Sequence, residues 1–177
     1  MTFVLSAARK AILDDLRPRY PNAKALTTPL LHLCQEQEGW CSPEIIDYVA
    51  LELGVTGAHV QGVVTFYTMF LKKKPGKRVI WVCRTQACEL CGAKDLQQHI
   101  EEKLGIHAGE TTSDGEFTLM KAECLAACGQ GPMVQLDDEF FENLTPAKMD
   151  KIIDDARKRA PKVAGPFSSL YLPVEKG

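Results

Sequence analysis

Five of the seven cysteines of this chain lie in two short segments whose spacing suits metal binding. Cys83 and Cys88 are separated by four residues, and Cys124 and Cys128 by three. Two loops at one edge of a sheet can bring four thiolates together, and four thiolates are the ligands that a [2Fe-2S] cluster requires. Glycines beside both segments would let backbone N–H groups approach the cluster sulfurs. The spacing therefore predicts an iron–sulfur site on these four cysteines.

Two other chemistries fit some of the same thiols. Structural zinc takes ligand pairs two to four residues apart, so a zinc site stays open, although zinc knuckles usually have a C-x2-C spacing. Cys88 and Cys91 form a C-x-x-C motif between a predicted strand and a predicted helix, where a thiol–disulfide oxidoreductase carries its redox pair. That second hypothesis leaves three clustered cysteines without a role.

The cysteines also indicate the compartment. Their number is odd, the chain of 177 residues is large enough to fold without disulfides, and its start has no signal-peptide pattern. We therefore expect a reducing, cytoplasmic environment. Cys34 and Cys41, far from the two clustered segments, are expected to be small apolar core residues.

The composition argues against several classes of partner. The chain is 45% hydrophobic and 25% charged, which is ordinary for a soluble protein. Its formal net charge of −2 gives no basic field that would attract nucleic acid. The longest apolar run, over residues 60–71, is shorter than the roughly 20 residues that a membrane-spanning helix needs. We expect no nucleic acid and no direct membrane insertion.

Helical periodicity fills residues 1–76. Four helices are expected, with Ser6, Ser42 and Thr56 as N-caps of the first, third and fourth. The lysine-rich segment 72–77, which contains Pro and Gly, ends this pattern and predicts a solvated linker. The sequence thus predicts an N-terminal all-α helical-bundle domain over residues 1–76.

From residue 77 the pattern becomes one of strands and helices. Strands are expected over residues 79–83, 117–122, 133–136 and 140–141, and helices over 93–104 and after Thr145–Pro146. The two cysteine segments follow the first two of these strands. We expect an α/β domain with a small mixed sheet over residues 77–160, and an irregular C-terminal tail over 161–177.

Seven segments in this order resemble one known family, the small [2Fe-2S] ferredoxin-like subunit of the NADH dehydrogenase module of respiratory complex I. They are residues 31–40, 62–70, 83–88, 111–119, 124–128, 131–133 and 144–146. The resemblance implies a thioredoxin-like [2Fe-2S] domain behind an all-α helical domain. It also implies one [2Fe-2S] cluster bound by Cys83, Cys88, Cys124 and Cys128.

The resemblance further implies a partner and a function. FMN and NADH are expected on a larger flavin subunit, paired with this chain as a heterodimer within a multi-subunit complex. The chain itself lacks a complete dinucleotide-binding motif, so on its own it is not expected to be catalytic. The implied role is electron transfer beside that flavin in NADH:quinone oxidoreductase, a translocase, with the subunit peripheral on the cytoplasmic side of the inner membrane. The equivalent diaphorase subunit of an NAD-linked hydrogenase or formate dehydrogenase is the close alternative.

Three positions need separate expectations. Ala126 stands where the family commonly has glycine, so the loop is expected to be strained there if φ is positive. Cys91 is an additional thiol, and the family spacing favours Cys88 as the ligand. Pro132 is expected to follow a cis peptide bond, by analogy with thioredoxin-like folds. A Rieske-type centre is not expected, because no histidine lies inside either cysteine loop.

Overall fold

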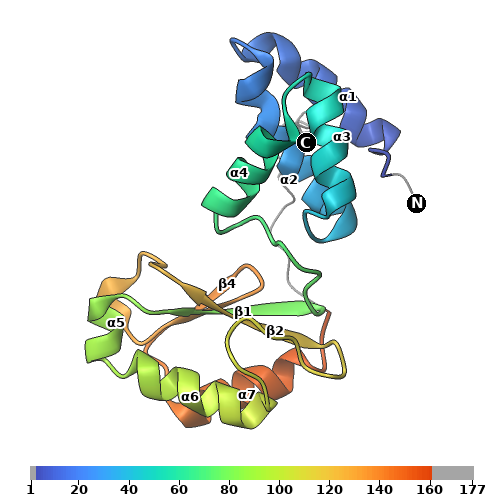
Figure 1. The fold of residues 1–177 in the computed structure, drawn as a ribbon. Helices are drawn as coiled ribbons and strands as arrows, with labels where there is room; N and C mark the ends of the chain where they lie inside the picture. Colours follow the sequence, from blue (N-terminus) through green and yellow to red (C-terminus); the bar gives the residue numbers. More distant parts are fainter. Residues whose placement is uncertain (1–2, 161–177) are drawn as a thin grey trace, which may run out of the picture. The chain divides into compact units, whose positions relative to one another are not determined.

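The computed structural model of the protein describes residues 3–160. The chain divides between Lys74 and Pro75 into two compact units, an N-terminal helical unit and a C-terminal unit that contains a sheet (Figure 1). No helix within the described residues is both long and apolar enough to cross a bilayer. The tail predicted for residues 161–177 lies outside the described part of the chain.

The described part of the N-terminal unit is built from helices. They are α1 (Ala7–Leu16), η1 (Arg17–Arg19), η2 (Ala23–Leu26), α2 (Thr27–Glu38), α3 (Pro43–Leu53) and α4 (Gly57–Phe66). The Ser42 and Thr56 side chains accept hydrogen bonds from backbone N–H groups in the first turns of α3 and α4, as expected for N-caps. Ser6 occupies the N-cap position of α1, but its side chain makes no cap hydrogen bond. Caps therefore fix the starts of α3 and α4, whereas α1 begins without one.

The helices of this unit share one apolar core, which includes Cys34 and Cys41. Both cysteine side chains are buried, and burial raises the pKa of both thiols, that of Cys41 to about 12. A thiol that is protonated at neutral pH is a poor nucleophile. The prediction that these two cysteines are core residues is confirmed.

The C-terminal unit contains a four-stranded mixed sheet with the order β2-β1-β3-β4. Its strands are β1 (Arg78–Cys83), β2 (Phe117–Ala122), β3 (Val134–Leu136) and β4 (Glu139–Phe141). β1 pairs with β2 in parallel and with β3 in antiparallel orientation, and β3 and β4 form a hairpin. A parallel pair needs a long crossover connection, which α5 (Gln86–Leu90) and α6 (Ala93–Leu104) supply between β1 and β2.

α6 and α7 (Pro146–Ala156) lie on the same face of this sheet (Figure 1). Apolar side chains from the strands and from both helices form one core beneath the sheet; its fully buried members include Ile80, Phe117, Leu119, Ile100, Met149 and Ile153. The buried Arg78 pairs with Glu116 at 2.8 Å at the start of β1. The sheet is therefore anchored on one side by apolar packing and at its amino-terminal edge by an ion pair whose Arg78 side chain is buried.

Gly76, just before β1, packs against the turn that precedes β2. Its N–H donates to Thr118 Oγ1 at 2.7 Å. A Cβ added at this position would lie 2.9 Å from the Gly115 carbonyl oxygen and 3.1 Å from backbone carbons of the two following residues. Only glycine allows the two backbone segments to approach this closely.

We predict that Gly76→Ala lowers the free energy of unfolding of the C-terminal unit by about 1–3 kcal/mol, because backbone on both sides must move. Gly62→Ala is the matched control, since Gly62 lies inside α4 with open space around it. Alanine there should stabilise by roughly 0.5–1 kcal/mol through helix propensity. Urea unfolding measures both, followed by Trp81 fluorescence in a Trp40→Phe background for Gly76→Ala and by Trp40 fluorescence in a Trp81→Phe background for Gly62→Ala. Equal effects of the two substitutions would contradict the steric argument.

Candidate metal centre

Both cysteine segments leave the same edge of the sheet. Cys83 is the last residue of β1, and its register partner is Ala122, the last residue of the parallel strand β2. The Arg84 N–H donates to the Ala122 carbonyl oxygen at 3.0 Å, so pairing continues past the strand end. Cys124 follows two residues after Ala122. The two loops that carry the cysteines therefore begin side by side.

The four predicted ligands fall into a buried pair and an exposed pair. Cys83 and Cys88, the latter in α5, are buried in a small apolar cluster with Ala93 and Met133. Cys124 and Cys128 are exposed, and Cys128 begins the short helix η3 (Cys128–Gln130). The first pair thus belongs to the interior and the second to the surface.

Within each pair one thiol shifts the pKa of the other. Burial, together with the Cys83 hydrogen bond and charge, raises the pKa of the Cys88 thiol to about 11. The hydrogen bond and charge of Cys124 raise the pKa of Cys128. The charge of Cys83 adds to the shift of Cys128, and that of Cys128 adds to the shift of Cys88. The thiols therefore interact electrostatically both within each pair and between the two loops.

Hydrogen-bond donors surround the Cys83 sulfur. The Thr85 Oγ1 lies 3.3 Å from Cys83 Sγ, and Thr85 stands at the N-cap of α5 without capping it. Burial raises the pKa of Cys83, but hydrogen bonds from the Thr85 hydroxyl, from the Thr85 and Leu125 backbone and from Cys88 outweigh it and lower the pKa. Donors of this kind stabilise a thiolate and tune a metal bound to it.

The second loop has a comparable donor and a strained residue. The Ala126 N–H donates to Cys124 Sγ at 3.4 Å. Ala126 has φ of 64°, so the condition under which strain is expected at this place, where the family commonly has glycine, is met. The conformation that directs this N–H toward the sulfur is therefore one that alanine adopts at a cost.

A third segment, residues 131–133 before β3, lies against Cys88. A Cβ added at Gly131 would lie 3.4 Å from both Cα and Sγ of Cys88 and 3.4 Å from Cβ of Cys91. The Gly131–Pro132 peptide bond is cis, as expected by analogy. Cysteine and glycine spacing did not predict the close approach of this segment to Cys88, because the contact depends on the path of the chain between them.

The donor set suits a cluster with two irons. Four thiols arranged as two pairs match two thiolates for each iron of a [2Fe-2S] cluster. Within residues 3–160, no three Cys, His, Asp or Glu side chains form a group that could hold a metal ion, so the four predicted ligands are not gathered into one such group. Cys91, the additional thiol, is exposed at the C-cap of α5.

An ion pair also joins the two cysteine loops. Arg84 follows Cys83 directly, Glu123 precedes Cys124 directly, and the two side chains are in contact. Both are exposed, so solvent screens the pair and it contributes little to stability. It nevertheless places a positive charge against the Glu123 carboxylate beside the candidate centre.

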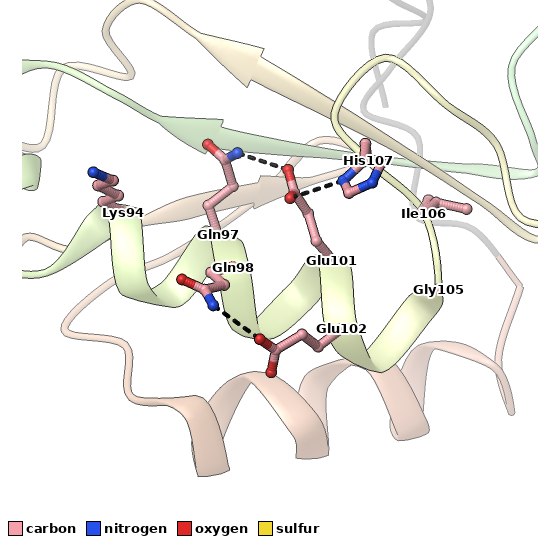
Figure 2. Close-up of a pocket in the computed structure, with 8 residues that line it drawn as sticks. All are labelled: Lys94, Gln97, Gln98, Glu101, Glu102, Gly105, Ile106 and His107. Carbon is pink, nitrogen blue, oxygen red and sulfur yellow. Dashed lines mark hydrogen bonds and ion pairs between the residues drawn. The ribbon is translucent and has the colours of Figure 1, made fainter.

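A large open hollow lies elsewhere, along α6. It has a volume of about 560 Å³ and is lined by polar side chains around Glu101, which accepts a hydrogen bond from Gln97 at 2.7 Å and lies 3.2 Å from His107 Nδ1 (Figure 2). Burial raises the pKa of Glu101, but its hydrogen bonds with Gln97 and His107 outweigh this and lower it. The lining includes no cysteine, so this hollow does not belong to the candidate centre.

Comparison with known proteins decides the family. The family described as thioredoxin-like [2Fe-2S] ferredoxin matches residues 13–157. The chain belongs to this family. The expected fold class, a thioredoxin-like [2Fe-2S] domain with a small mixed sheet and a helical N-terminal region, is confirmed.

Named relatives of this ferredoxin-family chain belong to one kind of enzyme. The E subunit of the NADH-quinone oxidoreductase of Rickettsia bellii is 42% identical over 150 residues, which cover 83% of this chain and 90% of the relative. The subunit of the same name from Mycobacterium bovis is 38% identical over 144 residues, which cover 81% of this chain and 57% of the relative. The chain therefore spans little more than half the length of the mycobacterial protein.

A solved structure has a similar fold. The crystal structure of an NAD+-reducing [NiFe]-hydrogenase in the H2-reduced state aligns with a TM-score of 0.66 and 16% identity, over 80% of this chain and 24% of that chain. At this level of identity the match establishes only the common fold.

We predict that Ala126→Gly raises the free energy of unfolding by up to about 1 kcal/mol, because glycine adopts a positive φ without the Cβ penalty. Ala127→Gly is the matched control, since Ala127 has φ of −113°. That change should destabilise, because glycine only adds freedom to the unfolded chain there. Urea unfolding of the metal-free variants measures both effects; stabilisation by Ala127→Gly would count against local strain at residue 126.

Proposed function

We propose that this chain is the electron-transfer subunit of an NADH:quinone oxidoreductase of the respiratory complex I type. In this proposal Cys83, Cys88, Cys124 and Cys128 hold one [2Fe-2S] cluster. The observation that carries it is that the two loops bearing these thiols leave the ends of adjacent parallel strands at the same edge of the sheet. The relatives from NADH-quinone oxidoreductases, 38% and 42% identical, indicate the complex in which the cluster works.

A bound [2Fe-2S] cluster supplies reversible one-electron transfer. The residues of this chain would bind the cluster and set its surroundings. Cys83 and Cys88 hold their side of the site away from water, next to Met133. The Thr85 hydroxyl and backbone N–H groups donate to the sulfurs and so favour the more negative, reduced state. Cys124 and Cys128 lie at the surface, which is the side that a partner's redox group can approach.

The proposal places FMN and NADH on a larger partner subunit. NADH gives up two electrons as hydride, whereas a [2Fe-2S] cluster takes one at a time, so a two-electron carrier must stand between them. The chain lacks a complete dinucleotide-binding motif, and its Gly129-Gln130-Gly131-Pro132 segment is part of the cysteine site. A position peripheral to the cytoplasmic side of the inner membrane follows from membership of such a complex.

Two alternatives receive less support. The quinone oxidoreductase subunits reach 42% identity with this chain, which favours quinone as the final acceptor. A dithiol redox enzyme uses an accessible thiol of low pKa as its nucleophile. Cys88 instead is buried, and burial with the neighbouring Cys83 raises its pKa to about 11.

Cysteine substitutions test the ligand assignment. Cys88→Ser should lose the visible absorption and the EPR signal of the reduced cluster, because one iron loses a ligand. Cys91→Ser is the matched control three residues away, and it should retain both signals together with iron and acid-labile sulfide. The reverse pattern would assign the ligand role to Cys91, and a colourless wild-type protein containing zinc would refute the cluster.

Enzyme assays test where the two-electron chemistry resides. The purified, cluster-containing chain, free of flavin, should oxidise NADH no faster than a buffer blank, since it has no hydride acceptor. Reconstitution with the flavin subunit should give NADH oxidation with an artificial electron acceptor. NADH oxidation by the chain alone would contradict the assignment of flavin and NADH to the partner.

A further inference from the structure

Thr85, which is half-buried, stands between two of the predicted ligands. It follows Cys83 by two residues and occupies the N-cap position of α5, the short helix that contains Cys88. Its backbone has the extended conformation of an N-cap residue, with φ of −73° and ψ of 159°. Its side chain nevertheless accepts no hydrogen bond from the first turn of α5, and Thr85 Oγ1 lies 3.3 Å from Cys83 Sγ. The hydroxyl therefore contacts a predicted ligand sulfur and leaves the start of the helix uncapped.

Two other threonines of the chain show what this residue type does at a helix start. Thr56 and Thr145 also occupy N-cap positions with extended backbone, and each accepts a hydrogen bond from the N–H three residues later, at 3.2 and 3.3 Å. The corresponding N–H after Thr85 is that of Cys88. A side-chain cap typically raises the folding equilibrium constant about fivefold. Thr85 lacks that contribution, so its contact with the sulfur is the interaction that calls for an explanation.

Metal binding would decide which of the two groups donates. A free Cys83 thiol and the Thr85 hydroxyl could each be the donor of this hydrogen bond. A cysteine binds metal as a thiolate, which has no proton to donate. With metal bound, the Thr85 hydroxyl is therefore the donor and the Cys83 sulfur is the acceptor. A donor of this kind stabilises negative charge on the sulfur, and that charge is larger when a bound cluster is reduced.

The second cysteine loop provides a contrast. The Ala126 N–H donates to Cys124 Sγ at 3.4 Å, but this donor belongs to the backbone and does not depend on the side chain. The donor at position 85 does depend on it, because only serine and threonine carry a hydroxyl on Cβ. Cys83 is also buried whereas Cys124 is exposed, and a hydrogen bond is electrostatically stronger away from water. The residue type at position 85 therefore changes the surroundings of a buried sulfur.

We propose that Thr85 raises the reduction potential of the bound cluster by donating a hydrogen bond from its hydroxyl to the Cys83 sulfur. The proposal rests on the proposed function, which supplies the cluster, and it assigns to one side chain a large influence on how readily the chain accepts an electron. Thr85 acts through Cys83 and is therefore a positioning residue. Because its donor favours the more negative state, the chain is reduced more readily than it would be with an apolar residue at this position.

The test measures the reduction potential of the full, cluster-loaded chain by a redox titration followed by EPR. Thr85→Val removes the hydroxyl and keeps the branched shape of the side chain. It should lower the ratio of reduced to oxidised protein at a fixed ambient potential about tenfold, a shift of about −59 mV for a one-electron couple. Thr85→Ser keeps the donor and should stay within about twofold of the unaltered chain. Thr85→Ala is the second apolar variant, for the case that valine prevents folding.

Thr145→Val is the matched control, because Thr145 is the same residue type at an N-cap position where the hydroxyl does cap its helix, α7. It should lower the folding equilibrium constant of the cluster-free chain about fivefold and leave the reduction potential unchanged. Thr85→Val should lower the potential and leave the folding equilibrium nearly unchanged, since no cap bond is lost at α5. Urea unfolding of the cluster-free variants measures the folding equilibrium.

An unchanged potential in Thr85→Val would overturn the proposal while leaving the proposed function intact. A potential as low in Thr85→Ser as in Thr85→Val would also overturn it, because the hydroxyl would then not be the cause. Loss of the cluster from both apolar variants, with retention in Thr85→Ser, would mean that Thr85 retains the metal instead of tuning it, which equally overturns the proposal. An unaltered chain that is colourless and free of iron would contradict the proposed function itself.

Discussion

The parallel pairing of β1 with β2 is the constraint on which the candidate centre depends. Six residue pairs fix the register, from Arg78 opposite Phe117 to Cys83 opposite Ala122. A slip by one residue would displace Cys124 relative to Cys83 by about 3.3 Å and turn every side chain of one strand to the other face. The apolar core beneath the sheet opposes such a slip, since it would expose Ile80 or Leu119. Packing far from the cysteines therefore controls whether they meet.

The sequence was most informative where the signal is local. Pro43 after Ser42 and Pro146 after Thr145 marked helix starts that the structure contains, and the alternation of strands and helices after residue 77 indicated the α/β unit. The cysteine spacing indicated two thiol pairs because strand ends and short loops restrict what four thiols can do. Family resemblance added the cis bond before Pro132 and pointed to Ala126 as a strained position if its φ is positive, which it is.

Features that depend on tertiary contacts were not accessible in this way. α5 is five residues long, too short to show helical periodicity, and Thr85 at its start faces the Cys83 sulfur instead of capping it. The approach of Gly131 to Cys88 joins residues 43 positions apart. Ser6 has the residue type and backbone conformation of an N-cap, yet its side chain makes no cap bond, because residue type alone does not fix a side-chain direction.

The division of the thiols into a buried and an exposed pair links stability to electron transfer. Burying Cys83 and Cys88 removes two polar groups from water, a cost that the donors around them offset and that metal ligation would offset further. Exposing Cys124 and Cys128 leaves the other side of the centre accessible. A centre buried on all sides would be insulated from its partner, and one exposed on all sides would lose its apolar shell. The loop after β2, which contains the strained Ala126, carries Cys124 and Cys128 and so forms the accessible side of the centre.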